Sequence, residues 1–291
     1  MSERLCLLSI HAHPDDEASK GAGTVARYHA EGVHTVLVTA TGGEEGDILN
    51  PAMEGLAVRE HLHEVRMREL EDAVAIIGYD ELVLLGYRDS GMPDTPSNAH
   101  PRSFAQADLR EAVGRLVAVI RRARPQVILT YAEDQQGYRH PDHLRVHEIS
   151  VLAFDAAGDP EQFPDSGEPF QPLKLYYNGS LREWFLRRHE KFLELGLESP
   201  YTERLAQFAA VTDEIGPLTT IDLTGFELIR RRALLAHATQ IDPNSPYWFG
   251  LPDEAERSLH HAESFVLSRS LVGPIESEDD LFAGIRHLVS S

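Results

Sequence analysis

The sequence predicts an α/β protein with a mostly parallel sheet flanked by helices, and with additional α/β elements towards its C-terminus. Two observations support this fold class. Short apolar, β-branched runs alternate with longer segments of helical period through the first half of the chain, which is the pattern of parallel strands joined by crossover helices. The length of 291 residues, with 42% hydrophobic and 25% charged residues, suits a globular protein with a sizeable core.

The first half of the chain is expected to contribute four strands and three helices. The strands are expected at residues 5–10, 35–41, 81–85 and 127–131. Helices are expected between them at residues 16–30, 57–77 and 105–122. The last helix is ended by Arg124-Pro125, because a residue that precedes proline disfavours the helical conformation.

The second half of the chain has a less regular pattern. A helix is expected to run from residue 143 to residue 157, followed by an irregular, turn-rich connection, as its Gly and Pro residues indicate. Further strands are expected at residues 173–177 and 218–223, and further helices at 182–195, 225–240 and 255–268.

Acidic residues outnumber basic ones, with 47 Asp and Glu against 27 Lys and Arg, so the formal net charge is −20. This charge repels polyphosphate and anionic lipid, so neither nucleic acid nor a membrane is expected as a partner. The N-terminal apolar run ends at Ile10, which is too short for a secretory signal. The single cysteine, Cys6, cannot form an intramolecular disulfide. We therefore expect a cytoplasmic protein.

Two short polar motifs follow two of the expected strands. His-Pro-Asp-Asp-Glu at residues 13–17 follows the first strand, and His-Pro-Asp-His at residues 140–143 follows the strand at 127–131. Ligands of open α/β sheets bind at the carboxyl ends of the strands, so we expect the two motifs to meet there. Either motif alone also reads as an ordinary helix start, because Asp accepts hydrogen bonds from free N–H groups at that position.

The donor types in these motifs predict one zinc ion per chain. His13 and Asp16 are three residues apart, as are His140 and His143, and this spacing brings side chains to one side of a turn. A catalytic zinc usually takes three protein ligands and keeps one position open. We expect His13, Asp16 and His143 to be the ligands, with substitution of zinc by Fe²⁺ left open.

Three residues of the motifs remain for catalysis. Asp15 is expected to act as the general base, and His140 to stabilise the oxyanion or protonate the leaving amine. For Asp142 two readings stay open, a helix cap or an orienting partner of a neighbouring histidine. Arg66 lies on an expected helix whose charged face would ordinarily be solvated.

Several longer segments resemble the LmbE-like zinc deacetylase superfamily and, within it, the mycothiol S-conjugate amidases of actinobacteria. The resemblance covers nearly the whole chain, and its most specific segments are residues 11–17, 19–22, 48–53, 88–91, 140–143, 163–165, 174–177 and 237–244. The resemblance implies a Rossmann-like fold. We therefore expect residues 1–157 to form a Rossmann-like metal-binding core, and residues 158–291 to complete the substrate cleft as one continuous domain with it.

The resemblance also implies roles for individual residues. It implies that His13, Asp16 and His143 bind zinc and that Asp15 is the general base, as the motifs alone indicate. Beyond the motifs, it implies that His140 and Tyr138 assist at the carbonyl, and that Arg66 and Asp89 hold the inositol hydroxyls of the substrate.

The resemblance further points to a subgroup and to a substrate. Lys20 follows the first motif as in the amidases, where the related deacetylases have an uncharged polar residue. Gln136 and Arg139 depart from the amidase pattern and put the preferred acyl group in doubt. The expected reaction is hydrolysis of the amide of a mycothiol S-conjugate, a small pseudodisaccharide thiol conjugate, to a mercapturic acid and glucosaminyl-inositol during detoxification.

Other readings stay open at this stage. The alternative within enzymes is deacetylation of N-acetylglucosaminyl-inositol in mycothiol biosynthesis, or a paralogous amide hydrolase of natural-product biosynthesis. A metal-dependent sugar-binding module without turnover is the alternative from another class, and the presence of Asp15 beside a full ligand set argues against it. Whether the chain forms a homo-oligomer is left open.

Overall fold

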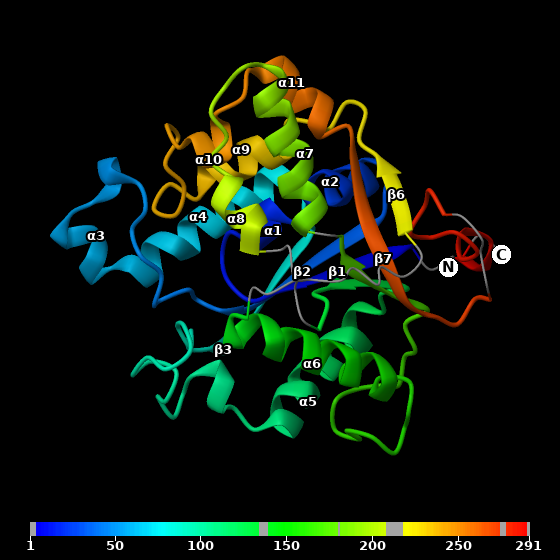
Figure 1. Ribbon diagram of the computed structural model, residues 1–291. Coiled ribbons are helices and arrows are strands. Elements are labelled where there is room, and N and C mark those ends of the chain that lie inside the picture. Colours follow the sequence, from blue (N-terminus) through cyan, green and yellow to red (C-terminus); the bar gives the residue numbers. More distant parts are fainter. Residues whose placement is uncertain (1–3, 134–138, 180, 208–217, 274–277, 290–291) are drawn as a thin grey trace.

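A computed structural model describes residues 4–133, 139–179, 181–207, 218–273 and 278–289 of the chain (Figure 1). Its strands are β1 (Cys6–His11), β2 (His34–Thr41), β3 (Glu81–Tyr87), β4 (Val127–Thr130), β5 (Lys174–Asn178), β6 (Leu218–Asp222) and β7 (Ala262–Ser270). Its α-helices are α1 (Asp16–Ser19), α2 (Ala22–Ala30), α3 (Leu56–Glu60), α4 (Leu62–Ile77), α5 (Leu109–Ala123), α6 (Pro141–Ala156), α7 (Leu181–Glu194), α8 (Thr202–Gln207), α9 (Ile229–Ala236), α10 (Pro246–Phe249), α11 (Asp253–Leu259) and α12 (Arg286–Val289).

The strands form one sheet in the order β3-β2-β1-β4-β5-β7-β6. The five strands from β3 to β5 pair in parallel, whereas β7 pairs antiparallel with both β5 and β6. The predicted α/β class with a mostly parallel sheet flanked by helices is therefore confirmed. β1 lies between β2 and β4, so the segments that follow β1 and β4 leave the same edge of the sheet side by side.

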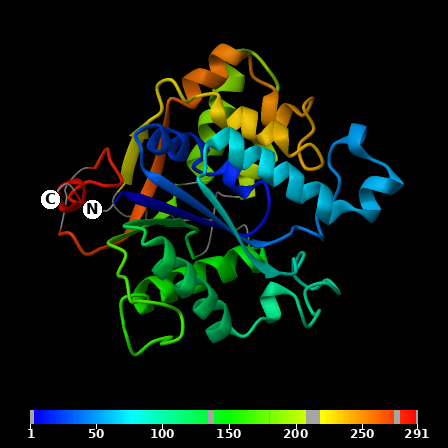
Figure 2. The same cartoon turned by 180° about the vertical axis from the view of Figure 1, so that it is seen from behind.

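Helices cover both faces of the sheet, as Figures 1 and 2 show. Alternate residues of β1 face opposite ways: Leu8 packs with α5 and α6, whereas Leu7 packs with α2, α4 and α9. Because both faces are covered, β1 and the neighbouring β4 are buried along their whole length, as is usual for parallel strands.

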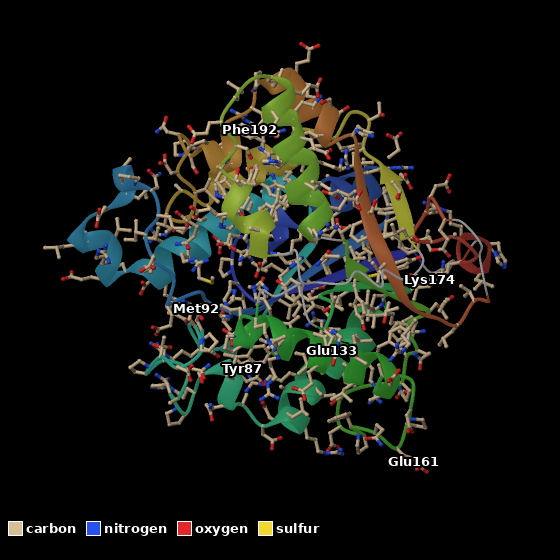
Figure 3. All side chains as sticks on the ribbon, in the orientation of Figure 1. Tyr87, Met92, Glu133, Glu161, Lys174 and Phe192 are labelled. Atoms are coloured by element: carbon tan, nitrogen blue, oxygen red, sulfur yellow. The ribbon has the colours of Figure 1, made fainter. Side chains whose placement is uncertain are left out.

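Helices α7, α8, α10 and α11 form a helical lobe beside α9. An aromatic cluster that includes Phe185, Phe192 and Tyr201 forms its core, and Figure 3 labels Phe192 at the upper end of the molecule. Inside the lobe, Arg188 of α7 donates two hydrogen bonds, of 2.7 and 2.6 Å, to the carboxylate of Glu256 of α11.

Several expected helices have different bounds in the structure. The helix expected at 16–30 is interrupted at Gly21, which has φ +82°, and the helix expected at 57–77 is divided at His61 into α3 and α4. The helix expected at 105–122 begins only at Leu109, and the one expected at 225–240 covers only Ile229–Ala236.

The helix expected at residues 255–268 is confirmed up to Leu259 by α11 and is wrong beyond it. The chain leaves α11 after Leu259 and continues as β7. Pairing with β5 and β6 fixes this segment as a strand, although only Phe265 of its nine residues is fully buried. Strands β5 to β7 add the second half of the chain to the same sheet, whereas the division at residue 157 stays a prediction. Among the described residues, no helix is both long and apolar enough to cross a membrane.

Candidate active site

The two histidine motifs meet at the carboxyl edge of the sheet, as their positions predict. The first begins two residues beyond the end of β1, and the second leads directly into α6. β1 and β4 pair in register from Leu7 and Val127 onwards, which brings the two connections together. Pro141 occupies the first turn of α6, where its fixed φ suits a helix start.

The three expected metal ligands face one another and are all buried. His13 Nδ1 lies 3.4 Å from Asp16 Oδ2, and His143 Nε2 lies 3.3 Å from the same oxygen. Two donors that each bind a tetrahedral zinc ion at about 2.0–2.1 Å lie about 3.3 Å apart. The separations of these donor atoms therefore fit a zinc ion.

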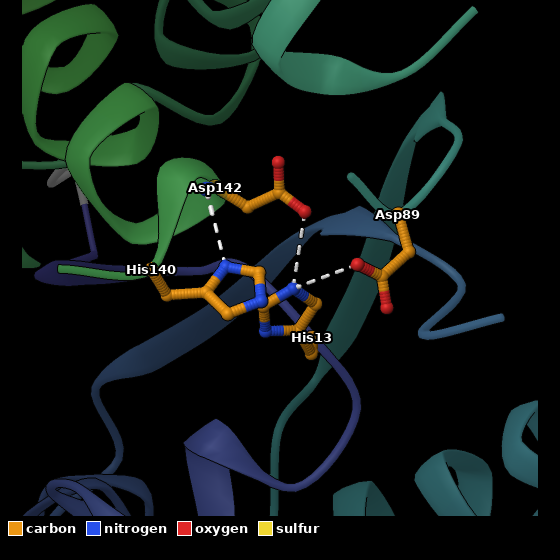
Figure 4. Close-up of side chains that lie close together, drawn as sticks. All are labelled: His13, Asp89, His140 and Asp142. Carbon is orange, nitrogen blue, oxygen red and sulfur yellow. Dashed lines mark hydrogen bonds and ion pairs between the residues drawn. The ribbon is translucent and has the colours of Figure 1, made fainter. Parts of the chain in front are cut away.

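The other nitrogen of His13 faces a second group of side chains. His13 Nε2 lies 3.2 Å from Asp142 Oδ2 and 3.5 Å from Asp89 Oδ1, as Figure 4 shows. Together with His140, these residues form a second cluster of metal-binding types. Its carboxylates already accept backbone hydrogen bonds, Asp142 from Ser90 and Asp89 from Gly91.

Because Asp142 and Asp89 already accept backbone hydrogen bonds, a metal is favoured on the Nδ1 side of His13. A metal-bound histidine usually donates its other ring N–H to a carboxylate, which fixes the tautomer and the orientation of the ring. Asp142 is placed to accept that proton, and it is itself held by the backbone N–H and the hydroxyl of Ser90. Of the two readings left open for Asp142, the geometry favours the orienting partner, because His140 is the residue at the N-cap of α6.

Burial and charge set the protonation of the ligand side chains. Burial lowers the pKa of His143 to about 3, so its ring is neutral near pH 7. Burial also lowers the pKa of His13, but hydrogen bonds to surrounding carboxylates outweigh it and raise that pKa well above its usual value. Burial raises the pKa of Asp16, but its interactions with the histidines and Lys20 hold it well below its usual range. His143 and Asp16 are therefore in the forms that bind a metal, whereas His13 must release the proton on its Nδ1 when a metal binds.

Asp15 lies beside this group with an unusual backbone. Its φ is 113°, a conformation that is rare for any residue other than glycine. Although it occupies the N-cap position of α1, its side chain makes no capping hydrogen bond. The carboxylate instead accepts a hydrogen bond of 3.1 Å from Arg66 Nη2, and burial raises its pKa.

His140 has one ring nitrogen fixed by the backbone. Its Nδ1 accepts the backbone N–H of Asp142 at 3.2 Å, and its ring packs edge-on against His13 with the centroids 4.6 Å apart. Because Nδ1 is an acceptor, the neutral ring carries its proton on Nε2. His140 can therefore donate a hydrogen bond without becoming a cation.

The remaining expected site residues lie at different depths around this centre. Lys20 donates to Asp16 Oδ1 at 2.6 Å and lies over the ring of Tyr131. Arg66 is 2% exposed, so the expectation of a solvated side chain is wrong. It donates to the carbonyls of Pro14 and Gly43 as well as to Asp15.

Four further residues were singled out from the sequence, three of them beside the second motif. Tyr138, expected at the carbonyl, and Gln136 lie outside the described residues. Arg139 is exposed. Asp89 lies beside His13 and is 3% exposed, and its contact with a sugar stays a prediction.

The site also contains residues for which the sequence predicted no role. Tyr131 stacks on the ring of His143, with centroids 4.5 Å apart and planes 4° apart, and its hydroxyl accepts the backbone N–H of Ala12. Glu17 and His237 pair inside the protein behind Asp15. Only their presence in the motifs at 11–17 and 237–244 pointed to them, because a contact across 220 positions produces no local spacing.

This chain is similar in sequence to known proteins over a span that includes both histidine motifs. The family model described as PIG-L: GlcNAc-PI de-N-acetylase matches residues 8–154. Mycothiol S-conjugate amidase of Streptomyces coelicolor is 46% identical over 293 residues, covering 98% of this chain and 99% of that relative. The 1D-myo-inositol 2-acetamido-2-deoxy-alpha-D-glucopyranoside deacetylase of Geodermatophilus obscurus is 41% identical over 292 residues, covering 96% of this chain and 97% of that relative.

A solved structure extends the similarity to three dimensions. The N,N'-diacetylchitobiose deacetylase from Pyrococcus horikoshii superposes with a TM-score of 0.61 over 93% of this chain and 86% of that chain. At 17% identity, this likeness shows a shared fold, which by itself does not determine an activity.

Proposed function

Because the chain belongs to the PIG-L family of GlcNAc-PI de-N-acetylases, a family of amide hydrolases, we propose that it hydrolyses the amide of mycothiol S-conjugates. The products are a mercapturic acid and glucosaminyl-inositol. The observation that carries this choice is the 46% identity to a mycothiol S-conjugate amidase over 98% of this chain and 99% of the relative.

The alternative substrate is the N-acetylated pseudodisaccharide, since a deacetylase of the inositol acetamido-glucopyranoside is 41% identical over 96% of this chain. Lys20 favours the amidase. Its ammonium group contacts Asp16 at 2.6 Å, so a positive charge at this position changes the field beside the reacting amide, whereas an uncharged residue would not.

The proposed metal is zinc, held by His13, Asp16 and His143, with iron left open. The donor types and their 3.3 and 3.4 Å separations support this assignment. When bound, zinc polarises the amide carbonyl and lowers the pKa of its water.

The chain's own residues are proposed to handle the protons. The Asp15 carboxylate accepts a proton from the attacking water, and Arg66 holds that carboxylate in place at 3.1 Å. His140 donates its Nε2–H to the carbonyl oxygen as negative charge develops there. Ser90 and Asp142 keep the ring of His13 in one orientation. Tyr138 is still proposed to assist at the carbonyl, and Lys20, Arg66 and Asp89 to contact the substrate.

The test compares kcat/KM of the purified, zinc-loaded protein for a mycothiol S-conjugate and for N-acetylglucosaminyl-inositol. We expect the S-conjugate to be preferred by at least about tenfold, the discrimination that a single well-placed contact provides. Lys20→Ser is the matched variant, and it should reduce this preference while zinc content is unchanged. A wild-type preference for the acetylated sugar would overturn the proposal in favour of the deacetylase.

A further inference from the structure

A fully buried pair, Glu17 and His237, lies directly behind Asp15. Both side chains are 0% exposed, and Glu17 Oε1 lies 2.5 Å from His237 Nε2. The second carboxylate oxygen, Glu17 Oε2, accepts the backbone N–H of Asp15 at 3.0 Å. The pair thus connects an imidazole that follows α9 to the backbone of the residue proposed as the base.

Asp15 needs such support because of its conformation. A non-glycine residue with φ of 113° has a strained backbone, and this conformation persists only where the surroundings fix it. The side chain of Asp15 provides no cap for α1, so this conformation is not the by-product of a helix-capping bond from its own carboxylate.

The segment that carries His237 is itself anchored from several sides. Thr239 donates its backbone N–H and its hydroxyl to Glu69 of α4, at 2.7 and 2.6 Å, and its carbonyl accepts the N–H of Leu49 at 2.8 Å. Figure 2 shows α4 and α9 running together on this face of the sheet. The segment that places His237 against Glu17 is therefore held in position by the hydrogen bonds of Thr239.

A simple helix-start motif does not explain the arrangement. In a capping box, an acidic residue at the third helical position accepts the N–H of the N-cap residue, whereas Glu17 is at the second position of α1 after the N-cap residue Asp15. That motif works at a solvated surface and needs no partner for the carboxylate. Here the carboxylate is buried against an imidazole, so burial and pairing hold it in one position.

We propose that Glu17 and His237 are positioning residues that hold the backbone of Asp15 in its left-handed conformation and so direct its carboxylate at the reacting water. The inference rests on the proposed role of Asp15 as the base. His237 fixes the Glu17 carboxylate, Glu17 fixes the N–H of Asp15, and Arg66 holds the Asp15 side chain from the other side.

A double-mutant cycle with Glu17→Ala and Asp15→Asn tests this chain of contacts, using whichever of the two amide substrates the wild type hydrolyses faster. Glu17→Ala should lower kcat by about 10- to 100-fold, the loss that follows from a shift of about 1 Å in a catalytic group. The KM value should stay within about twofold and the zinc content should be unchanged. In the Asp15→Asn background, Glu17→Ala should cause almost no further loss, because residues that act through one another are not additive.

Hydrogen exchange of the Asp15 amide gives a readout that does not depend on turnover. We expect exchange to accelerate by at least about tenfold in Glu17→Ala and in His237→Gln, since the N–H loses its fixed acceptor. Glu278→Gln is the matched control, because Glu278 is also a buried carboxylate, paired with Lys174 at 2.5 Å. Figure 3 labels Lys174 beside β7, and this control should leave the Asp15 amide and kcat unchanged.

The outcomes separate this inference from the proposed function. Fully additive losses in the cycle, or unchanged exchange at Asp15, would overturn the positioning role while leaving the base assignment intact. Near-wild-type turnover of Asp15→Asn alone would overturn the base assignment and the positioning role together. If Glu17→Ala does not fold, Glu17→Gln takes its place in the same cycle, with a smaller loss expected because the amide oxygen can still accept the N–H of Asp15.

Discussion

At the scale of single residues, His13 has a different environment at each ring nitrogen. Nδ1 faces Asp16, and Nε2 faces Asp142 and Asp89. A ring with a carboxylate behind it is fixed in orientation and becomes a stronger metal donor. The residues around the centre therefore divide into those that would hold the metal and those that orient or assist them.

Metal content should separate these two sets. We expect His143→Ala to lose zinc together with activity, because the loss of one of three ligands opens the site. His140→Ala should keep its zinc and lose about 10²- to 10⁴-fold in turnover, the range for a lost proton donor or oxyanion partner. Elemental analysis of the purified variants beside kcat measurements checks both. Full zinc occupancy in His143→Ala would show that the metal is bound elsewhere.

The site residues that the sequence could identify are those with local spacing. The pairs His13–Asp16 and His140–His143 are each three residues apart, and the strands before them predicted that they would meet. The partners of Asp15 could not be identified in this way. Arg66 of α4 contacts Asp15 directly, and His237, from the segment after α9, reaches it only through Glu17. The contacts of Arg66 and His237 depend on helix packing that no spacing encodes.

At the scale of elements, β1, β2 and β4 were predictable because they are buried on both faces and therefore mostly apolar. The resemblance drawn from these motifs is confirmed by the family match and by the near-full-length relatives. β7 was missed for the opposite reason. It is partly buried along most of its length, so neither a twofold nor a continuous apolar pattern marks it, and tertiary pairing overrides the local preference.

The break between α1 and α2 provides an element-scale prediction. Gly21 has φ +82°, and a Cβ there would meet ring carbons of Phe265 at 3.8 Å and a methyl carbon of Leu129 at 4.0 Å, which are ordinary contact distances. Gly21→Ala should therefore lower the free energy of unfolding by about 1–2 kcal/mol through backbone strain alone. Denaturant unfolding measures this. Gly55→Ala is the control, because Gly55 has φ −167° and open space around it, and an equal loss there would contradict the explanation.

At the scale of the whole molecule, a buried ion pair joins α7 and α11 within the helical lobe. Arg188 of α7 and Glu256 of α11 form a two-pronged contact, and Arg188 also donates to the hydroxyl of Tyr201 at 2.8 Å. Burial raises the pKa of Glu256, but hydrogen bonds from His260 and Arg188 outweigh it and hold this pKa at about 2. The lobe packs beside α9 (Figure 1), and His237 directly follows this helix.

This pKa predicts how acid destabilises the protein. A carboxyl group whose pKa is lower in the folded than in the unfolded state stabilises the fold above its unfolded pKa of about 4.3, and the stabilisation is lost as the pH falls towards the folded value. With the folded pKa at about 2, Glu256 should contribute on the order of 3 kcal/mol near pH 7 and lose it between about pH 5 and pH 2. The difference in unfolding free energy between the wild type and Glu256→Gln, measured in denaturant, should shrink over that range. Glu194→Gln is the control, since the Glu194 side chain is 65% exposed and its difference curve should be flat. A Glu256→Gln difference that does not change with pH would show that this carboxyl group has the same pKa in the folded and unfolded chain, so that the lobe would have to be held by its aromatic packing.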